Sequence, residues 1–418
     1  MHKYRLISKK GEGTFSEVLK AQSIKSGKHV AIKCMKNHFD SIDQVNNLRE
    51  IQALRRLAGH PNIIKLHEVL YDEPTGRLAL VFELMDMNVY EAIKGRRHYL
   101  PEQKVKHYMY EMLKALDYMH RNGIFHRDVK PENLLLVDDE IKLADLGSCR
   151  GIYSRQPYTE YISTRWYRAP ECLLTNGYYN FKMDIFAAGC VWFEIVALFP
   201  LFPGQNEMDQ IHKIHNVLGT PSEEYLTSKF KMNASHMDFN FVQKKGTGIE
   251  RLVPHAEPEV VELLKRLIKY DPDERILARQ VLKDAYFKDL READKQRSAA
   301  ARDAAARDST ASASAAPAPR SVRKRSQSTC NFVMLCNCSI HMAAFFSTLP
   351  TRSAQTASCP SSTACRCPKR AADSTGSPSA AANLASNASK RGSMRSASAS
   401  TAAPAAAAAR WASEAHAS

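Results

Sequence analysis

Three polar side chains that could support phosphoryl transfer lie near one another in the sequence: Asp128, Asn133 and Asp145. Such a site needs one carboxylate that orients the attacking hydroxyl, and a second carboxylate with a further oxygen ligand that hold Mg²⁺ on the phosphates. The apolar run 134–137 and the turn residues 138–140 predict a short strand and a hairpin between Asn133 and Asp145. A hairpin brings the residues at its two ends together, so the spacing favours this chemistry.

The residues around these side chains form two motifs. Residues 126–133 read His-Arg-Asp-Val-Lys-Pro-Glu-Asn, and residues 145–147 read Asp-Leu-Gly. The first resembles the catalytic loop of eukaryotic protein kinases, and the second resembles their magnesium loop with leucine in place of phenylalanine. The resemblance implies one role for each residue: a base at Asp128, a phosphate contact at Lys130, and Mg²⁺ ligands at Asn133 and Asp145.

The same resemblance implies the architecture that would hold these residues. It is a two-lobed α+β fold over residues 4–287, with a small antiparallel sheet in about 4–84 and a mainly helical lobe in about 85–287. A lysine two residues after the base is typical of Ser/Thr kinases. The implied reaction is transfer of the γ-phosphoryl group of ATP, with Mg²⁺, to Ser or Thr of protein substrates.

A glycine-containing turn near the N-terminus is the expected phosphate cover. Gly11 and Gly13 lack a Cβ, so the backbone can approach phosphates closely. The strand 30–33, Val-Ala-Ile-Lys, resembles the kinase lysine strand, and Lys33 would reach the phosphates. Ser16 stands where the family has a third glycine. The resemblance assigns nucleotide contacts to Lys10, Gly11, Glu12, Gly13, Thr14, Phe15, Ser16, Glu17, Val18, Ala31, Lys33, Glu83, Met85 and Leu135.

Two helices are expected around these loops. Apolar residues at 45, 48, 51, 54 and 57 predict a helix over 42–58. By resemblance, this helix carries Glu50 to an ion pair with Lys33. Its sequence differs from the cyclin-binding helix of cell-cycle kinases, so no cyclin partner is expected. A second helix over 101–123 ends at an Asn-Gly pair, a favourable C-terminal signal.

The segment from Asp145 to Glu171 contains a Thr-x-Tyr pair, Thr159 and Tyr161. This pair resembles the regulatory phosphosites of the mitogen-activated kinase branch, modified by an upstream kinase or by autophosphorylation. Each phosphate adds about −1.5 to −2 charge. The arginines expected to receive the phosphates are Arg127, Arg165 and Arg168. In that branch Arg168 also helps to select proline after the target residue.

Two structural anchors of the larger lobe are expected as well. By resemblance, Asp184 bonds the backbone of the catalytic loop and Arg275 pairs with Glu171. Further local sequences, among them 156–161 and 147–150, resemble the MAK/MRK-like kinases. That group is tied to cilia and flagellar length, which implies a location in the cytoplasm and in the cilium or flagellum.

Residues 296–418 differ in composition from the rest of the chain. They are dominated by Ala, Ser, Thr, Pro and Arg, and they carry +11 of the net charge of +15. Such a composition cannot close a core, so we predict a mostly disordered, basic tail with at most a marginal helix over 298–307. The basic run 320–326 is either a nuclear address or a solvated charge run.

The tail holds six of the ten cysteines, and their spacing does not form a paired zinc knuckle. Residues 327–351 are long enough for a membrane span but too polar, so no span is expected there or earlier. The first five residues are polar and charged, and the four scattered cysteines before 296 therefore indicate reduced, cytosolic thiols.

Two alternatives to an active kinase stay open. A pseudokinase or scaffold is suggested by Ser16 and Leu146, although Lys33, Glu50, Asp128, Asn133 and Asp145 are all present. Binding of nucleic acid by the basic tail is the other alternative. The domain itself offers no helix that would read DNA, so no nucleic-acid partner is expected for it.

Overall fold

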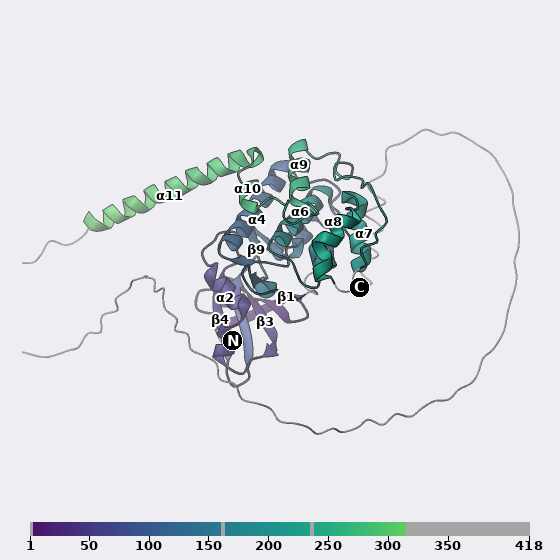
Figure 1. Ribbon diagram of the computed structural model, residues 1–418. Helices are drawn as coiled ribbons and strands as arrows, with labels where there is room; N and C mark the ends of the chain where they lie inside the picture. Colours follow the sequence, from purple (N-terminus) through teal and green to yellow (C-terminus); the bar gives the residue numbers. More distant parts are fainter. Residues whose placement is uncertain (1–2, 160–163, 235–237, 315–418) are drawn as a thin grey trace, which may run out of the picture. The chain divides into compact units, whose positions relative to one another are not determined.

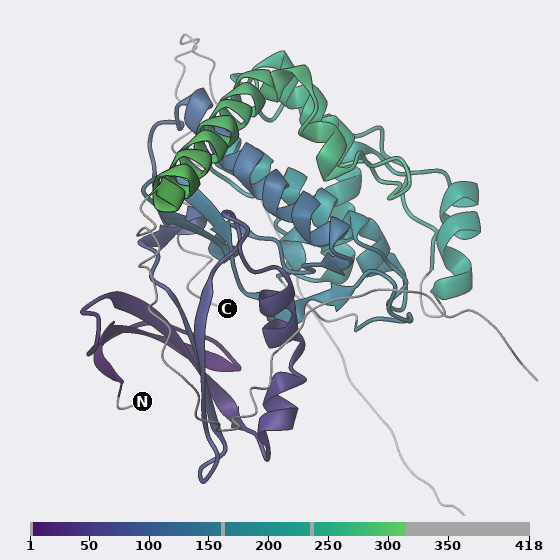
Figure 2. The ribbon, with the colours of Figure 1, turned by 90° about the vertical axis from the view of Figure 1, so that its left-hand side faces the viewer.

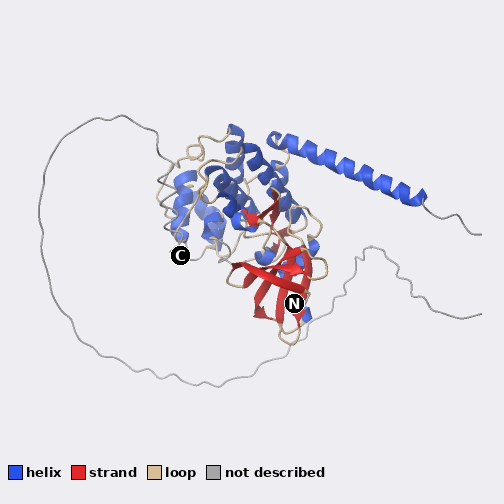
Figure 3. Ribbon diagram, turned by 180° about the vertical axis from the view of Figure 1, so that it is seen from behind, coloured by secondary structure: helices blue, strands red, loops and turns tan. Residues whose placement is uncertain are grey.

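The computed structural model describes residues 3–159, 164–234 and 238–314, the last eleven of these by their backbone alone. It contains a small lobe built on an antiparallel sheet and a larger, mainly helical lobe (Figures 1 and 3). The predicted two-lobed α+β kinase fold is therefore confirmed.

The strands are β1 (Tyr4–Glu12), β2 (Ser16–Ser23), β3 (His29–His38), β4 (Leu66–Asp72), β5 (Arg77–Glu83), β6 (Met87–Asn88), β7 (Ile124–Phe125), β8 (Leu134–Val137), β9 (Glu140–Leu143) and β10 (Arg150–Gly151). The helices are α1 (Ile42–Asn46), α2 (Arg49–Arg56), α3 (Val89–Ile93), α4 (Glu102–Arg121), α5 (Pro170–Leu174), α6 (Lys182–Ala197), α7 (Glu207–Leu218), α8 (Glu223–Phe230), α9 (Pro258–Leu267), α10 (Ala278–Val281) and α11 (Lys288–Ser314).

The five strands of the small lobe pair in the order β1-β2-β3-β5-β4. Side chains alternate between the two faces of a strand, so Val30 and Ile32 lie on one face and Lys33 on the other. Val30 and Ile32 are buried in a small cluster with Ala21 and Val81. This cluster fixes the register of β3, and the register in turn directs Lys33 to the opposite face.

The prediction of one helix over 42–58 is wrong in one respect, because the structure has two helices there, α1 and α2. Leu48 has an extended backbone, φ −62° and ψ 127°, and it separates α1 from α2. Asn47 precedes the break as the C-cap of α1, a position that suits a side chain with low helix propensity. Val45 in α1 is fully buried in the main core. The apolar periodicity is continuous across the break, which is why it predicted one helix.

The larger lobe is organised around α4 and α6. Almost every residue of α6 is buried, including Trp192 and Phe193, as expected for a helix that is apolar on all sides. The helix predicted over 101–123 is α4, and Gly123 follows its C-cap with φ +74°. Only glycine adopts this conformation without strain, so the helix stops where the catalytic loop must begin.

A small sheet, β6-β8-β9, carries the predicted hairpin. Asp138 and Asp139 both have positive φ, 49° and 64°, which matches the tight turn that joins two twisted strands. The N–H of Ala144 donates to the carbonyl of Asn133 at 2.9 Å. The two ends of the hairpin, which carry the predicted Mg²⁺ ligands, are therefore held together.

The last described element, α11, is longer than the marginal helix predicted over 298–307. It runs without interruption from Lys288 to Ser314 and leaves the larger lobe as a single rod (Figures 1 and 2). Its first turns are attached to α4: Lys106 pairs with Asp289 at 2.7 Å, and Lys114 pairs with Asp294 at 2.9 Å. A helix that is already nucleated by such contacts extends easily into alanine-rich sequence.

None of the helices described in residues 3–314 has the length and apolarity that crossing a membrane requires. The apolar stretch 327–351 and the tail cysteines lie outside the described residues.

Candidate active site

Lys33 bridges two carboxylates at the junction of the lobes. Its Nζ lies 2.7 Å from Glu50 Oε1 and 2.9 Å from Asp145 Oδ1. Burial disfavours the charged amine, but the two carboxylates outweigh burial and raise the pKa of Lys33. Burial also raises the pKa of Glu50. At Asp145, whose side chain is half exposed, Lys33 outweighs the partial loss of solvation and lowers the pKa of the carboxyl. Lys33 is thus held as a cation, and Asp145 as an anion, in one connected group.

Asp128 lies at the centre of a second group, in the loop between β7 and β8. Asn133 donates from Nδ2 to the Asp128 carbonyl at 2.7 Å and to Asp128 Oδ2 at 3.0 Å. Lys130 Nζ lies 3.1 Å from the same Oδ2 and 3.5 Å from the Thr164 hydroxyl. The second carboxylate oxygen, Oδ1, is buried without a hydrogen-bond partner in the described part of the chain. It is therefore the oxygen left to accept a proton or a hydroxyl hydrogen bond.

Asp184, at the start of α6, fixes the backbone of the loop that contains Asp128. Its two oxygens accept the backbone N–H groups of His126 and Arg127, each at 2.8 Å. His120 contacts the same carboxylate at 2.9 Å. Asp184 is fully buried, so these bonds keep its charge compensated and leave the loop little freedom. The anchoring bonds predicted for Asp184 are present.

Asp145, the first residue of the predicted magnesium loop, has a strained backbone. Asp145 has φ 58° and ψ 71°, a left-handed conformation that is uncommon for residues other than glycine. Leu146 is 1% exposed and packs into the main core, so leucine supplies the apolar anchor expected at this position. A Cβ added at Gly147 would lie 3.3 Å from Asp145 Oδ1. Burial of Leu146 thus turns the Asp145 side chain toward Lys33.

The turn between β1 and β2 is tied to β3 by a residue that sequence reasoning missed. Lys36 Nζ lies 2.8 Å from Glu12 Oε1 and 2.9 Å from the carbonyl of Gly13. The turn is closed by a hydrogen bond from the N–H of Gly13 to the carbonyl of Ser16 at 2.8 Å. Phe15 at its tip is 68% exposed. Lys36 follows Lys33 by three residues, but no local motif marks it.

The connection between the lobes is also reinforced. Both carboxylate oxygens of Glu83 contact Lys142 Nζ, at 3.0 and 2.9 Å, and one of them accepts the Lys65 N–H. Glu83 ends β5 and Lys142 lies in β9, so this pair crosses from one lobe to the other. Within the described residues, the backbone of Met85 makes no hydrogen bond. It can therefore bond a ligand without losing an existing contact.

The remaining predicted nucleotide contacts lie on the elements that border this junction. Lys10, Gly11 and Glu12 end β1, Thr14 lies in the turn, Glu17 and Val18 lie in β2, Ala31 lies in β3, and Leu135 lies in β8. Val18 pairs with Lys33 across β2 and β3, and Ala31 precedes Lys33 by two residues on the same face. The predicted contacts of β1, β2 and β3 thus lie on paired strands next to Lys33, while Leu135 lies in the hairpin that leads to Asp145.

The oxygen donors present here fit Mg²⁺. Asn133 uses its Nδ2 on Asp128, which leaves the amide oxygen free to accept, and the side chain of Asp145 is 49% exposed. Mg²⁺ prefers such oxygen ligands and keeps several waters or phosphate oxygens, so two protein ligands suffice. No larger group of metal-binding side chains is found among the described residues.

Thr159, the first predicted phosphosite, is exposed, whereas Tyr161 lies outside the described residues. The carbonyl of Thr159 accepts a hydrogen bond from Arg127 Nη2 at 3.2 Å. The other two arginines proposed as phosphate partners have other contacts. Arg165 Nη1 donates to the carbonyl of Gln205 at 3.0 Å, and Arg168 Nη1 lies 3.1 Å from Glu207 Oε1.

Two further arginines, missed by sequence reasoning, lie near Arg127. Burial, followed by the positive charges of Arg49 and Arg127, lowers the pKa of Arg150. The Nε atoms of Arg127 and Arg150 are both buried without a hydrogen-bond partner among the described residues. Like charges repel one another, and Arg127 and Arg150 each keep an unused Nε donor, so an anion bound beside them would be stabilising. Because they lie on α2, the catalytic loop and β10, no local pattern indicates them.

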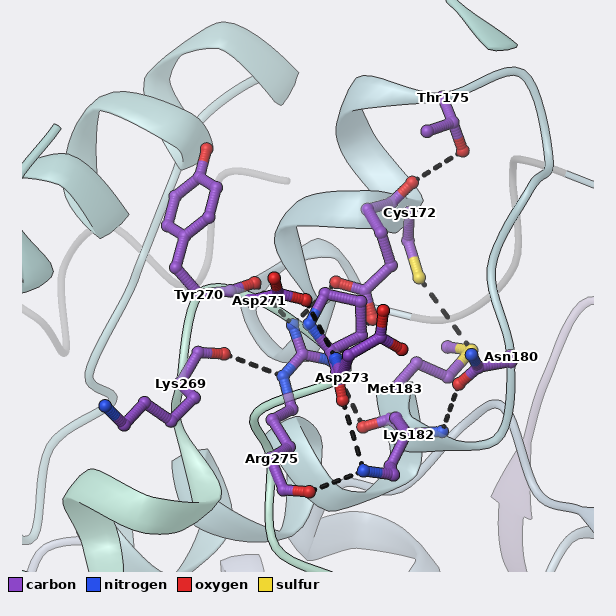
Figure 4. A network of polar contacts seen from close by, with 12 residues as sticks. Cys172, Thr175, Asn180, Lys182, Met183, Lys269, Tyr270, Asp271, Asp273 and Arg275 are labelled. Carbon is purple, nitrogen blue, oxygen red and sulfur yellow. Dashed lines mark hydrogen bonds and ion pairs between the residues drawn. The ribbon is translucent and has the colours of Figure 1, made fainter. Parts of the chain in front are cut away.

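Glu171 and Arg275 form the ion pair expected between them. Arg275 Nη2 lies 2.6 Å from Glu171 Oε2, and both side chains are almost completely buried. Arg275 also donates to the carbonyls of Lys269 and Tyr270, which leaves its guanidinium well satisfied (Figure 4). The pair joins α5, at the end of the segment that begins at Asp145, to the loop before α10.

Comparison with known proteins agrees with this geometry. The model of the protein kinase domain family matches residues 4–287. The MAPK/MAK/MRK overlapping kinase of Homo sapiens is 60% identical over 292 residues, 70% of this chain and 69% of the relative. Serine/threonine-protein kinase ICK of Mus musculus is 43% identical over 289 residues, 69% of this chain and 45% of the relative.

Serine/threonine-protein kinase MAK of Homo sapiens is 42% identical over 289 residues, 69% of this chain and 46% of the relative. The resemblance to MAK/MRK-like kinases that the sequence motifs indicated is thus confirmed. Together, the family match and these relatives show that the chain belongs to the protein kinase family, as a serine/threonine protein kinase of the group that includes MAPK/MAK/MRK overlapping kinase, MAK and ICK.

Proposed function

We propose that this kinase uses ATP and Mg²⁺ and transfers the γ-phosphoryl group to serine or threonine of protein substrates. The observation that supports this most is the proximity of two groups of side chains, one of Lys33, Glu50 and Asp145 and one of Asp128 and Asn133, which the hairpin holds together. Phosphoryl transfer needs little covalent chemistry from a protein, and its catalysis rests on positioning and charge stabilisation. A connected set of fixed charges is suited to that task.

Each residue would have a distinct part. Lys33, held by Glu50, orients the phosphates, and the turn 11–16 covers them with backbone N–H groups. Asn133 and Asp145 would hold Mg²⁺, which neutralises phosphate charge when bound. Asp128 orients the substrate hydroxyl through its unpaired oxygen and accepts its proton, while Lys130 stabilises negative charge on the transferred group. Glu83 and Met85 bond the adenine through their backbones.

We also propose regulation by phosphorylation of Thr159 and Tyr161, by an upstream kinase or by autophosphorylation. Arg127 supports this proposal for Thr159, because it contacts the Thr159 carbonyl and its positive charge acts on Arg150, so a phosphate there would offset both charges. Proline-directed selection through Arg168 is proposed from the resemblance. No cyclin, nucleic-acid or membrane partner is proposed.

A role in ciliary or flagellar length control, with a cytoplasmic and ciliary location, is proposed from the resemblance to the MAK/MRK-like group. It is tested by imaging the tagged full chain in a flagellated cell and measuring flagellar length after loss of the gene. Unchanged length together with exclusion from the flagellum would contradict the role and the location.

The test of activity uses the full chain with radiolabelled ATP, Mg²⁺ and a basic protein substrate. Wild-type protein is expected to incorporate label, and Asp128→Asn to incorporate almost none. Matched peptides with Ser-Pro and Ser-Ala test the proline preference. Equal labelling by the wild type and Asp128→Asn would sink the proposal. Nucleotide binding by thermal shift without any turnover would instead favour the scaffold alternative.

A further inference from the structure

The hydroxyl of Tyr179 is hydrogen-bonded both to Arg127, in the catalytic loop, and to Thr159, the proposed phosphosite. Tyr179 lies in the loop between α5 and α6, and its side chain is buried. Its hydroxyl accepts a hydrogen bond from Arg127 Nη2 at 2.7 Å and donates one to the carbonyl of Thr159 at 2.8 Å. The same Nη2 also reaches the Thr159 carbonyl, at 3.2 Å. One hydroxyl, one guanidinium nitrogen and one carbonyl therefore form a closed triangle.

Two aromatic rings hold the guanidinium of Arg127 within this triangle. Its Cζ lies 5.7 Å from the ring centroids of both Tyr158 and Tyr179. The rings lie against each other, with centroids 5.3 Å apart. Cations are attracted to aromatic faces at such distances, so Arg127 has a preferred place even without an anion.

The backbone beside Thr159 is fixed by the same loop. The N–H of Tyr158 donates to the carbonyl of Gly177 at 2.8 Å. Gly177 has φ +83°, and a Cβ there would come within 2.0 Å of the Tyr158 carbonyl oxygen. A second bond runs from Gln156 Nε2 to the carbonyl of Tyr179 at 2.6 Å. Residues 156–159 therefore follow the 177–179 loop closely.

Arg127 is next to the proposed catalytic base. Its backbone N–H is bonded to the buried Asp184, and its φ of 72° is unusual for a residue other than glycine. A change in the guanidinium position is thus transmitted through a constrained backbone to Asp128. Before any phosphate is present, the Tyr179 hydroxyl connects Thr159 to this arginine through two hydrogen bonds that are shorter than the direct one.

We propose that Tyr179 is a positioning residue that holds Thr159 against Arg127 in the unphosphorylated chain, and so sets the basal activity that phosphorylation raises. The inference rests on the proposed kinase activity and its control at Thr159. A phosphate on Thr159 would reach the arginines directly through stronger, charge-assisted bonds. The Tyr179 hydroxyl is therefore needed in the unphosphorylated form and largely dispensable in the phosphorylated form.

The experiment compares Tyr179→Phe with Tyr178→Phe in the full chain. Tyr178 is the adjacent tyrosine, it is exposed, and its hydroxyl makes no hydrogen bond among the described residues. Each variant is prepared with threonine or with phosphothreonine at 159, installed during translation. In Tyr179→Phe, kcat/KM of the unphosphorylated form is expected to fall about five- to tenfold, and that of the phosphorylated form less than about twofold, in line with the modest net contribution of the two hydrogen bonds that the hydroxyl makes.

Two results would overturn the proposal. One is an unphosphorylated Tyr179→Phe as active as Tyr178→Phe, and the other is an equal loss in both phosphorylation states, which a purely structural defect would give. Amide hydrogen exchange over 156–159, measured in the Asp128→Asn background, provides a readout that needs no activity. Faster exchange in Tyr179→Phe is expected there, and unchanged exchange also contradicts the proposal. An inactive wild type would contradict the proposed kinase activity. The hydrogen-exchange measurement would then decide alone whether Tyr179 positions Thr159.

Discussion

Arg275 and Glu171 form a buried ion pair with two parallel hydrogen bonds, and this pair joins α5 to the loop that precedes α10. Removal of one partner leaves the other charge buried and uncompensated, so Arg275→Ala is expected to destabilise the domain by about 3–5 kcal/mol. Chemical denaturation checks this. Arg279→Ala, which removes an exposed arginine of α10, is the matched control. Similar unfolding free energies for the two variants would contradict the expectation.

Glu50→Gln tests the positioning of Lys33. The substitution keeps the size of the side chain but removes the charge that lies 2.7 Å from Lys33 Nζ, so Lys33 is left with Asp145 alone. A displaced phosphate contact is expected to reduce kcat by about 100-fold, since errors near 1 Å have effects of that order. Steady-state kinetics measure the effect. Asp43→Asn, at an exposed position of α1, serves as the control and should retain full activity.

Lys36→Met tests the tie between β3 and the turn 11–16. The Lys36–Glu12 pair is roughly half exposed on both sides, and exposed pairs contribute only about 0.2–1 kcal/mol. The expected effect is therefore small: an increase of about two- to fivefold in KM for ATP, with kcat almost unchanged. Lys28→Met, in the turn between β2 and β3, is the control. A fall in kcat at constant KM would contradict a role in covering the nucleotide.

Glu194 gives a prediction for the pH dependence of stability. Burial raises the pKa of Glu194 to about 7, and its carboxylate accepts the Tyr167 hydroxyl at 2.7 Å. Between the ordinary pKa of 4.5 and 7, the folded state binds more protons at this group than the unfolded state does. The contribution of Glu194 to the free energy of unfolding is therefore largest below about pH 4.5. It falls by up to about 1.4 kcal/mol per pH unit as the pH rises toward 7.

Glu194→Gln keeps a hydrogen-bond acceptor for Tyr167 but cannot ionise. The unfolding free energy of this variant, measured from pH 5 to 8, is expected to rise relative to the wild type as pH increases. A constant difference over that range would show that Glu194 does not titrate there. Glu224→Gln, an exposed glutamate in the first turn of α8, controls for the loss of one negative charge.

The residues predicted as catalytic could be picked out from the sequence because they lie in short, contiguous motifs. Asp128, Asn133 and Asp145 needed only one hairpin to meet, and turn residues mark that hairpin. Lys36, Arg49, Arg150 and Tyr179 were missed because each acts through a partner on another element. Such contacts depend on tertiary packing, and one sequence alone contains no pattern that records them.

Two boundaries were mispredicted for related reasons. Apolar residues continue in register through Leu48, so periodicity cannot detect the turn that the backbone makes there. The length of α11 depends on Asp289 and Asp294, whose lysine partners lie far away in α4. In both cases a distant part of the fold decides what a local segment does.

The break at Leu48 has a consequence for how the enzyme behaves on dilution. Helix α1 supports α2. Val45 fixes α1 in the main core, and the Arg55 side chain of α2 donates to Asn46 Oδ1 of α1 at 3.0 Å. Because α1 and α2 belong to one continuous polypeptide, their association does not depend on the protein concentration. Specific activity should then be the same at nanomolar and micromolar enzyme, unlike that of a kinase whose helix is held by a separate subunit.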